Sequence, residues 1–357
     1  MATGKHSAKH AAPKKKKGGH GLIGVIVLVL IVLACGFVAQ KVLPGLTEQP
    51  GQVAEGQEIT IEVAEGSTTT QIAQLLKENG IIALESEFVN TVKNKGVADQ
   101  LKAGTYRFIG GEKVSDIVDA MVKGNAGYTV TIPEGYSAKQ IAKTVAAACE
   151  LDEDEFYAQT LKADQYVADY PFLDGVYNNS MEGFLFPDTY TVSYGSTADQ
   201  IVRMMLDNFS AQIASVDMSY AASKNLTTYD VVILASMTEK ESRDDSDKAS
   251  IVSVFYNRLH EGMSLGSDPT TYYAVGKDYT EPLTKQDLAS DNPYNTRNVN
   301  NKGLPPGPIC SPGMASLIAA AHPDETGYLF FFYSSKKDET MFFKDQASFD
   351  AAWAKLG

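Results

Sequence analysis

Two glutamates near the end of a predicted helix are the side chains of this chain best suited to proton transfer. Thr227 or Thr228 can cap a helix that runs through an apolar stretch and ends with Glu239 and Glu241. At about 100° per residue, Glu241 lies about 20° from Leu234 around the helix axis and so extends the apolar stripe. Glu239 points roughly 160° away from Glu241. The spacing therefore predicts different surroundings for the two carboxyl groups.

A carboxyl group on an apolar, partly buried helix face is expected to hold its proton near neutral pH. Burial disfavours the charged form and raises the pKa, which a general acid working near pH 7 requires. The alternative interpretation is that Glu241 is only the first solvated residue after a core helix. Helix geometry alone leaves both interpretations open.

A second group of polar residues follows this helix. Residues 254–259 read VFYNRL and include Asn257, and residues 262–270 read GMSLGSDPT. Gly262–Gly266 matches G-x-S-x-G, a motif that needs a strand before it and a helix after it to present a nucleophilic serine. Here a helical pattern precedes the motif, and Asp268-Pro269 is expected to break any helix directly after it. A serine hydrolase built on Ser264 and His322 is therefore a minor alternative.

A third group lies in a loop-rich region near residues 292–313. Tyr294 and Asn295 stand in an Asn-Pro-Tyr-Asn-Thr run, and GLPPGPI follows at residues 303–309. Pro and Gly stiffen such a loop and keep its amide and hydroxyl groups at the surface. Aromatic rings and amides in this setting suit sugar recognition. An ordinary ordered loop is the alternative.

The composition narrows the chemistry. The formal net charge is -13 over 357 residues, although residues 1–20 carry six Lys and no acid. A body this acidic is a poor ligand for a phosphate backbone, so no nucleic-acid partner is expected. Only His260 and His322 lie outside the basic tail, and the three Cys are far apart. We therefore expect no metal and no cofactor, and chemistry that runs on carboxylates, hydroxyls or backbone groups.

The N-terminal region predicts a membrane anchor. Residues 22–39 are 18 uncharged, mainly apolar residues, about 27 Å as a helix at ~1.5 Å per residue. Four consecutive Lys precede them, so residues 1–20 are expected to form a basic cytoplasmic tail, residues 21–40 a single transmembrane helix, and the rest to lie outside. A cleaved signal peptide is the competing interpretation. The predicted localisation is the cell membrane, single-pass, with an extracytoplasmic body.

The outside region is expected to contain two domains behind a linker at residues 41–57. Residues 61–73 (IEVAEGSTTTQIA) and 130–142 (VTIPEGYSAKQIA) form a weak repeat in which a strand pattern turns at Glu-Gly into a helix pattern. Residues 58–126 are predicted to form a small LysM-like α+β module, which either binds glycan or acts as a plain spacer. Residues 127–357 are predicted to form a larger mixed α+β catalytic domain. The fold class is α+β.

Taken together, these stretches resemble one family, the YceG-like endolytic murein transglycosylases (MltG). The order and spacing of the motifs and the preceding apolar segment all fit, and the resemblance covers most of residues 40–357. The matching stretches are EGFLFPDTY (182–190), LASMTEKES (234–242), VFYNRL (254–259), GMSLGSDPT (262–270), YNT (294–296), GLPPGPI (303–309) and PGMASLIAAAHP (312–323).

The resemblance implies cleavage of nascent peptidoglycan glycan strands at the MurNAc–GlcNAc bond, leaving a 1,6-anhydro-MurNAc end. It implies one catalytic glutamate that acts first as an acid and then as a base, which we place at Glu241, with Glu239 as the second choice. Partners in cell-wall synthesis are implied in the same way. The residues expected to contact substrate are Glu182, Asn257, Asp268, Tyr294 and Asn295.

Two alternatives stay open at this point. One is a glycan hydrolase with two carboxylates, in which Asp268 or Glu182 partners Glu241. The other is a non-catalytic peptidoglycan-binding anchor or scaffold, for which the repeat and the membrane helix would suffice. An acid-bearing apolar helix followed by polar Gly/Pro loops argues against a pure spacer.

Overall fold

The computed structural model of the chain describes residues 53–124 and 127–357. Contacts divide it into two compact units, and the second contains Thr60–Ser67, Val97–Arg107 and all residues from Ile117 onward. The first contains Thr68–Gly96 and Phe108–Asp116 with the residues that precede Thr60. The predicted cytoplasmic tail, membrane span and most of the linker lie outside the described residues.

The described residues contain no helix that is both long and apolar enough to cross a membrane. Mixed helices and small sheets make up both units, so the α+β class expected from the sequence is confirmed.

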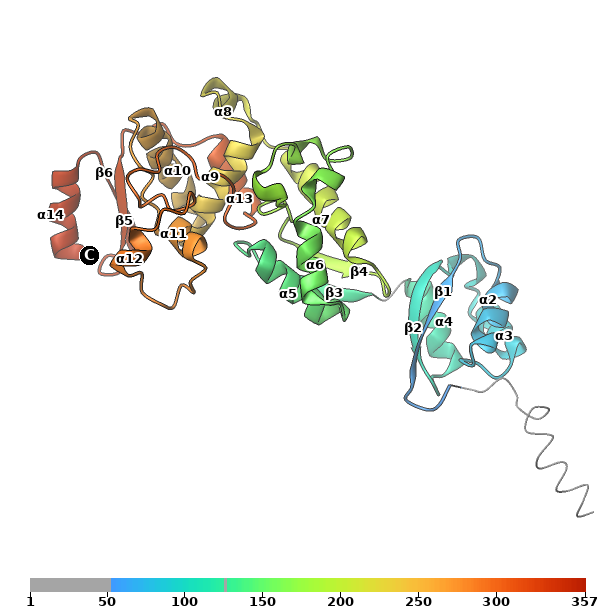
Figure 1. Cartoon of the computed structure of the whole chain (residues 1–357). Coiled ribbons are helices and arrows are strands. Elements are labelled where there is room, and N and C mark those ends of the chain that lie inside the picture. Colours follow the sequence, from blue (N-terminus) through green and yellow to red (C-terminus); the bar gives the residue numbers. More distant parts are fainter. Residues whose placement is uncertain (1–52, 125–126) are drawn as a thin grey trace, which may run out of the picture. The chain divides into compact units, whose positions relative to one another are not determined.

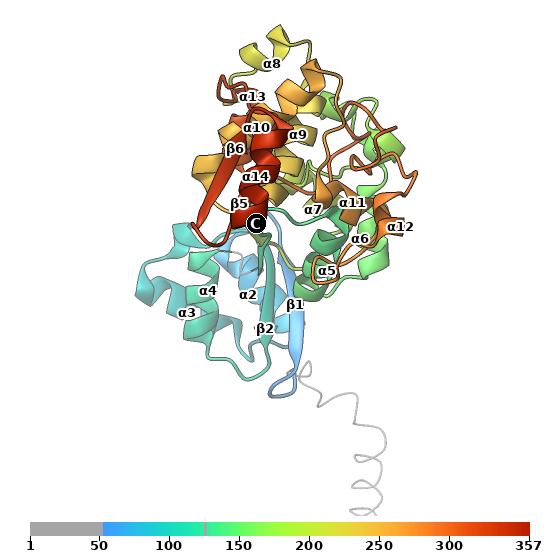
Figure 2. The same cartoon turned by 90° about the vertical axis from the view of Figure 1, so that its left-hand side faces the viewer.

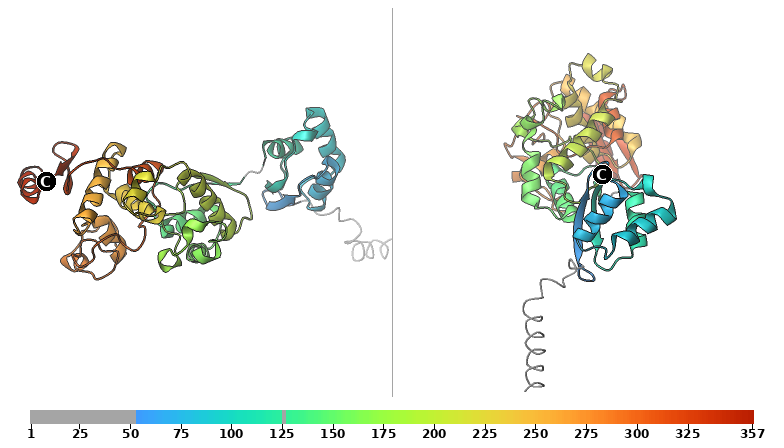
Figure 3. Two further views of the ribbon diagram at one scale, coloured as in Figure 1. Left: turned by 90° about the horizontal axis from the view of Figure 1, so that it is seen from above. Right: turned by 90° about the vertical axis from the view of Figure 1, so that its right-hand side faces the viewer.

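Strand–turn–helix segments form the region before residue 125 (Figures 1 and 3). Strand β1 (Glu58–Val63) pairs with β2 (Gly104–Ile109). Between them lie α2 (Thr69–Glu78) and α3 (Glu85–Lys95), which pack against each other. Helix α4 (Val114–Lys123) follows β2.

The two copies of the repeat fold the same way locally. Gly66 and Gly135 both have a positive φ, 78° and 77°, a backbone conformation that side chains with a Cβ rarely adopt. Thr68 and Ser137 then cap their helices, and each forms a reciprocal capping box with the Gln three residues later. The repeat therefore encodes a turn and a helix start, and it implies nothing about a shared ligand.

Within the second unit, β3 (Tyr128–Thr131) pairs with β4 (Thr189–Val192) in a two-stranded antiparallel sheet. The long connection between these strands contains α5 (Ala138–Cys149) and α6 (Glu153–Thr160), which pack together. Helix α7 (Ala198–Ile213) follows β4 and packs on α6. Buried aromatic and aliphatic side chains fill the space between these elements.

A helical cluster forms the other part of this unit's core. Helix α9 (Thr228–Glu241) packs against α10 (Asp245–His260), α11 (Asp268–Val275) and α13 (Met314–Ala321), as Figure 2 allows the reader to follow. Helix α10 also packs on α13. Residues from the second and third polar groups singled out in the sequence therefore lie near Glu239 and Glu241 in the last turn of α9.

A hairpin and a terminal helix complete the chain. Strands β5 (Phe330–Ser334) and β6 (Glu339–Phe343) pair in antiparallel register, and α14 (Gln346–Leu356) packs on both (Figure 2). The short helices α8 (Ser219–Ser223) and α12 (Lys285–Leu288) lie in connecting segments.

Candidate active site

Helix α9 is a core helix that is partly exposed only at its two ends, Thr228–Asp230 and Glu239–Glu241. Thr227 caps it in a reciprocal box with Asp230, as the sequence predicted. All eight residues from Val231 to Thr238 are buried, so this stretch is covered on every side and not along one stripe. The single apolar stripe inferred from the sequence is therefore an incomplete description of this helix. The surroundings of Glu241 come from neighbouring elements that meet the helix end.

Glu241 is the last residue of α9, and its partly exposed carboxyl group is enclosed by polar side chains. The Ser267 hydroxyl donates a hydrogen bond to Oε1 at 2.6 Å. The pKa of Glu241 is raised from 4.5 to about 7, mainly by burial and in smaller part by the nearby Asp268 carboxylate. The Ser267 hydrogen bond and the Arg258 and Arg297 guanidinium groups act in the opposite direction. A carboxyl group with this pKa can donate and accept a proton near neutral pH.

Glu239 has a different environment on the other side of the helix. Its carboxylate lies 3.4 Å from Lys248 Nζ, and the two side chains are 10% and 5% exposed. Its Oε2 accepts hydrogen bonds from the Gly313 backbone N–H at 3.0 Å and from the Ser316 hydroxyl at 2.5 Å. Gly313 occupies the N-cap position of α13 and has no side chain that could cap the helix. Glu239 therefore holds the start of α13, and its oxygens are already engaged.

Asp268 lies beside Glu241 at the start of α11. Its carboxylate forms an ion pair with Arg297 at 3.3 Å, and both side chains are about half exposed, at 55% and 45%. The prediction that Asp268-Pro269 breaks any helix was wrong, because α11 begins there. Proline is tolerated in the first helical turn, where the missing N–H has no intrahelical partner.

Glu182 is buried, only 5% exposed, and serves the start of another helix. Its Oε1 accepts the Ala138 N–H at 2.9 Å, and its Oε2 accepts the Tyr273 hydroxyl at 3.1 Å. Burial raises the pKa of Glu182 to about 7, although these hydrogen bonds lower it in part. The carboxyl group therefore joins α5 to α11 and presents no free oxygen to a ligand.

Tyr294 and Asn295 are neighbours with different placements. The Tyr294 ring is half-buried, 4.7 Å from the Tyr273 ring and 6.0 Å from the Tyr177 ring. Asn295 is fully buried, and its amide donates to the Leu288 and Ser290 carbonyls while accepting from the Thr271 hydroxyl and the Arg297 N–H. Asn295 therefore shapes the loop from inside.

A match to a known sequence family shows to which family the chain belongs. The YceG-like family matches residues 61–355 of the chain. The chain belongs to the YceG-like family. An endolytic murein transglycosylase of Bacillus subtilis is 34% identical over 289 residues, which is 78% of this chain and 79% of that protein.

Two further relatives extend the comparison. An endolytic murein transglycosylase of Streptococcus pneumoniae R6 is 30% identical over 356 residues; the match covers 92% of this chain but only 64% of that longer protein. A crystal structure of a YceG-like protein from Listeria monocytogenes has a TM-score of 0.57 at 31% identity, and the match covers 83% of this chain and 99% of that one.

In this YceG-like chain, Asn257 joins α10 to the segment before β5. Its amide donates to the Thr326 carbonyl at 3.0 Å and to the Tyr328 carbonyl at 2.9 Å. Both amide hydrogens are used in this way, so the donor end of Asn257 is not available to a ligand.

The G-x-S-x-G stretch lacks the surroundings of a nucleophile. Helix α10 precedes it and α11 follows it, whereas the motif requires a strand first. The Ser264 hydroxyl donates to the Thr296 carbonyl. His322 is exposed at the end of α13, with its ring 5.4 Å from that of Tyr220. These placements do not support a serine hydrolase.

Sequence reasoning missed three residues that face Glu241: Ser267, Arg258 and Arg297. Arg258 donates to the Leu329 carbonyl at 2.7 Å and to the Leu265 carbonyl at 2.5 Å, so its position beside the carboxyl is fixed. Arg258 belongs to the VFYNRL stretch already singled out, and Arg297 directly follows the YNT stretch, which was the available signal. Their direction toward Glu241 depends on how α10, α11 and the loop before residue 297 pack together.

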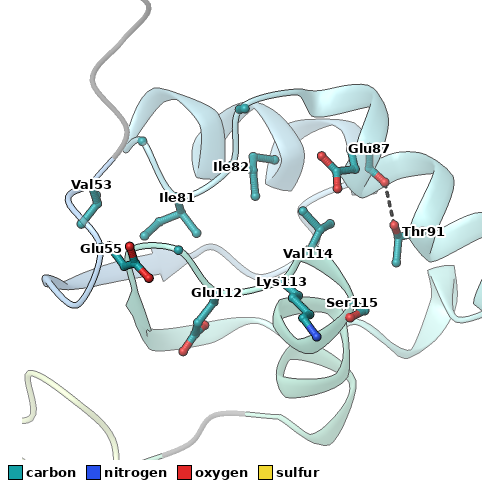
Figure 4. A pocket seen from close by; sticks show the side chains of 13 residues that line it. Val53, Glu55, Ile81, Ile82, Glu87, Thr91, Glu112, Lys113, Val114 and Ser115 are labelled. Carbon is teal, nitrogen blue, oxygen red and sulfur yellow. Dashed lines mark hydrogen bonds between the residues drawn. The ribbon is translucent and has the colours of Figure 1, made fainter.

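A cavity of about 800 Å³ lies in the first unit and is separate from this cluster (Figure 4). Ile81 and Ile82 lie among its lining residues, together with Glu55, Glu87 and Glu112. It contains none of the residues that face Glu241. No group of three or more His, Cys, Asp or Glu is arranged to hold a metal ion within residues 53–124 and 127–357.

Proposed function

We propose that this chain is a membrane-anchored endolytic peptidoglycan lytic transglycosylase. It cleaves the MurNAc–GlcNAc β-1,4 bond within nascent glycan strands and leaves a 1,6-anhydro-MurNAc end. Membership of the YceG-like family and the names of its relatives support this reaction class. The single observation that carries the assignment is the Glu241 carboxyl, partly exposed at the end of α9, with its pKa raised to about 7.

Glu241 acts twice in this mechanism. Its protonated form gives a proton to the glycosidic oxygen while positive charge develops at C1 of the muramoyl residue. The bond to the departing GlcNAc 4-oxygen breaks, and that sugar leaves with a free hydroxyl. The resulting carboxylate then takes the proton from the muramoyl 6-hydroxyl, whose oxygen closes onto C1. No water is consumed, so one carboxyl group returns to its protonated state.

A pKa near 7 suits this double role. An ordinary glutamate would be ionised at neutral pH and could not act as the acid, whereas a carboxyl with a much higher pKa would be a reluctant donor. Lys248 and the start of α13 occupy the carboxylate oxygens of Glu239, so they are not free to reach a substrate. We therefore assign catalysis to Glu241 and a positioning role to Glu239.

Digestion of purified glycan strands tests this proposal. The full chain, its Glu241→Gln variant and its Glu239→Gln variant are compared, and the products are identified by mass. Wild type and Glu239→Gln are expected to yield fragments with anhydro ends, and Glu241→Gln none. Equal cutting by wild type and Glu241→Gln contradicts the assignment, and absence of cutting by the wild type favours the scaffold alternative.

One observation keeps a hydrolase with two carboxylates as a second candidate. Asp268 is close enough to Glu241 to raise its pKa, so a second carboxylate does lie beside the proposed acid. Asp268 is also paired with Arg297 and half exposed, which suits electrostatic support of a cationic transition state. Product ends separate the two mechanisms, since hydrolysis leaves a reducing end in place of an anhydro end.

Among the expected substrate contacts, Asp268 and Tyr294 remain proposals on the basis of their exposure. We propose positioning roles for Glu182, Asn257 and Asn295, since the hydrogen bonds described above engage both Glu182 carboxyl oxygens, the donor end of Asn257 and both ends of the Asn295 amide.

The proposed location follows from the N-terminal sequence. We place residues 1–20 in the cytoplasm, residues 21–40 across the cell membrane and the catalytic part, residues 127–357, outside. Glycan binding by the LysM-like region, residues 58–126, and association with cell-wall synthesis proteins belong to the same proposal. Protease protection of the tail in membrane vesicles, with digestion of the body from outside, tests the orientation.

A further inference from the structure

Ser267 makes a hydrogen bond that helix capping does not explain. It occupies the N-cap position of α11, where a serine side chain ordinarily accepts a hydrogen bond from the second or third helical N–H. No such bond is present. Pro269 in the first turn has no N–H to offer, and the Ser267 hydroxyl is instead directed at Glu241 Oε1, 2.6 Å away.

The backbone of Ser267 is held rigidly on both sides. Its N–H donates to the Thr296 hydroxyl at 3.0 Å, and its carbonyl accepts the Thr270 hydroxyl at 2.7 Å. The two threonine hydroxyls lie 2.8 Å apart, and the Thr296 N–H also donates to Thr270 Oγ1. Ser267, Thr270 and Thr296 are all buried, at 2%, 0% and 1% exposed. The hydroxyl therefore approaches the carboxyl from a fixed direction.

A donor on Oε1 has a chemical consequence for the acid. In a protonated carboxyl group the carbonyl-like oxygen is the stronger acceptor, so a donor on one oxygen favours the proton on the other. Ser267 therefore favours Oε2 as the atom that carries the proton. In the ionised state the same hydroxyl stabilises the carboxylate.

We propose that Ser267 is a positioning residue of the reaction, which gives up its helix cap to confine the catalytic proton to Oε2 of Glu241. This inference rests on the proposed function, because it assigns a role within that mechanism. The charged groups that also face Glu241 are Arg258 from α10, Asp268 from α11 and Arg297 from the following loop, and Tyr279 lies nearby. None of them is shown to donate a hydrogen bond to the carboxyl.

The test is the pH profile of kcat for Ser267→Ala on purified glycan strands. Loss of the hydroxyl is expected to lower kcat about tenfold with little change in KM, because the proton can then occupy either oxygen. The alkaline limb is expected to move up by about one pH unit, because the ionised form loses its donor. Ser267→Thr, which keeps a hydroxyl, is expected to restore most of both.

Ser253→Ala is the matched control. Ser253 is also 2% exposed and loses an equally buried hydroxyl, but it bonds to Thr326 and the Ser250 carbonyl, away from Glu241. It is expected to leave the pH profile unmoved. The proposal is overturned if Ser267→Ala lowers kcat without moving the alkaline limb of the pH profile and Ser267→Thr does not restore kcat. Ser267 would then only fill space.

Two further variants keep the outcome decisive. Ser267→Cys retains a weak donor, so it is expected to shift the alkaline limb by an intermediate amount. This variant serves as the test if Ser267→Ala does not fold. An unshifted alkaline limb in folded Ser267→Cys contradicts the proposal. Glu241→Gln reports separately on the proposed function. Activity retained in that variant would refute the catalytic assignment, whatever Ser267 does.

Discussion

The two sides of the last turn of α9 bear the same side chain in opposite circumstances. On one side, the carboxylate of Glu239 meets the ammonium group of Lys248 and two hydrogen-bond donors at the start of α13. On the other side, Glu241 receives one hydroxyl donor, is crowded by protein and has its pKa raised to about 7. The difference shows that pairing makes a carboxylate structural, whereas crowding without a full complement of partners makes it a usable acid.

Removal of the proposed acid, Glu241, tests this comparison most strongly. Glu241→Gln is expected to lower turnover by roughly 10³-fold, since general acid–base catalysis contributes about 10²–10⁴-fold. Its fold should survive, because glutamine can still accept the Ser267 hydrogen bond. Product release from glycan strands and the unfolding transition measure the two effects. Turnover within threefold of wild type would place the acid elsewhere.

On the opposite side of the helix, substitution of Glu239 is expected to lower stability. Glu239→Gln removes the charge facing buried Lys248 and should lower the free energy of unfolding by about 2 kcal/mol. The loss is below that of a fully isolated charge because Lys248 keeps Asp245 at 2.8 Å. Denaturant unfolding measures it, and Lys248→Met in the same background should recover part of the loss. A variant as stable as wild type but inactive would reverse the two roles.

The pH dependence of stability sharpens the contrast further. The pKa of Glu241 is raised from 4.5 to about 7, so the folded state binds its proton more tightly than the unfolded state. This contribution to stability is therefore fully present below about pH 4.5 and is lost as the pH rises through about 7. Unfolding curves of Glu241→Gln should lack that part of the decline. Parallel pH dependences in both proteins would argue against the raised pKa.

The smallest expected effect is at Asp268. Asp268→Asn removes a negative charge that raises the pKa of Glu241, so the alkaline limb of activity should move to lower pH. Turnover should fall less than about tenfold, because Asp268 gives electrostatic support and takes no proton in a single-carboxylate mechanism. A loss as large as that of Glu241→Gln, with reducing ends in the wild-type product, would establish the two-carboxylate alternative.

Local features of this molecule followed directly from its residues. The cap at Thr227 lies where side-chain chemistry predicted it, because a cap needs only its neighbours within one turn. The same local reasoning failed at Asp268-Pro269, where a proline that cannot continue a helix was able to begin one.

The candidate site was only partly predictable for a related reason. Glu241 was proposed because a motif and a helix pattern agreed on it. Ser267, Arg258 and Arg297 were missed as its neighbours, and Asn295 was expected at a surface although it lies in the interior. Which way a loop residue faces depends on the element packed against it, and residues 241, 267 and 297 are separated by long stretches of chain.

By itself the sequence determined the α+β class, the start of helix α9 and the family to which the chain belongs. Those depend on short-range periodicity, capping and motif order, which are properties of neighbouring residues. Only the tertiary structure decided which of two glutamates is engaged in an ion pair and which is crowded and weakly partnered. That choice depends on desolvation and hydrogen bonding by α10, α11 and α13, and such terms exist only once those elements have packed together.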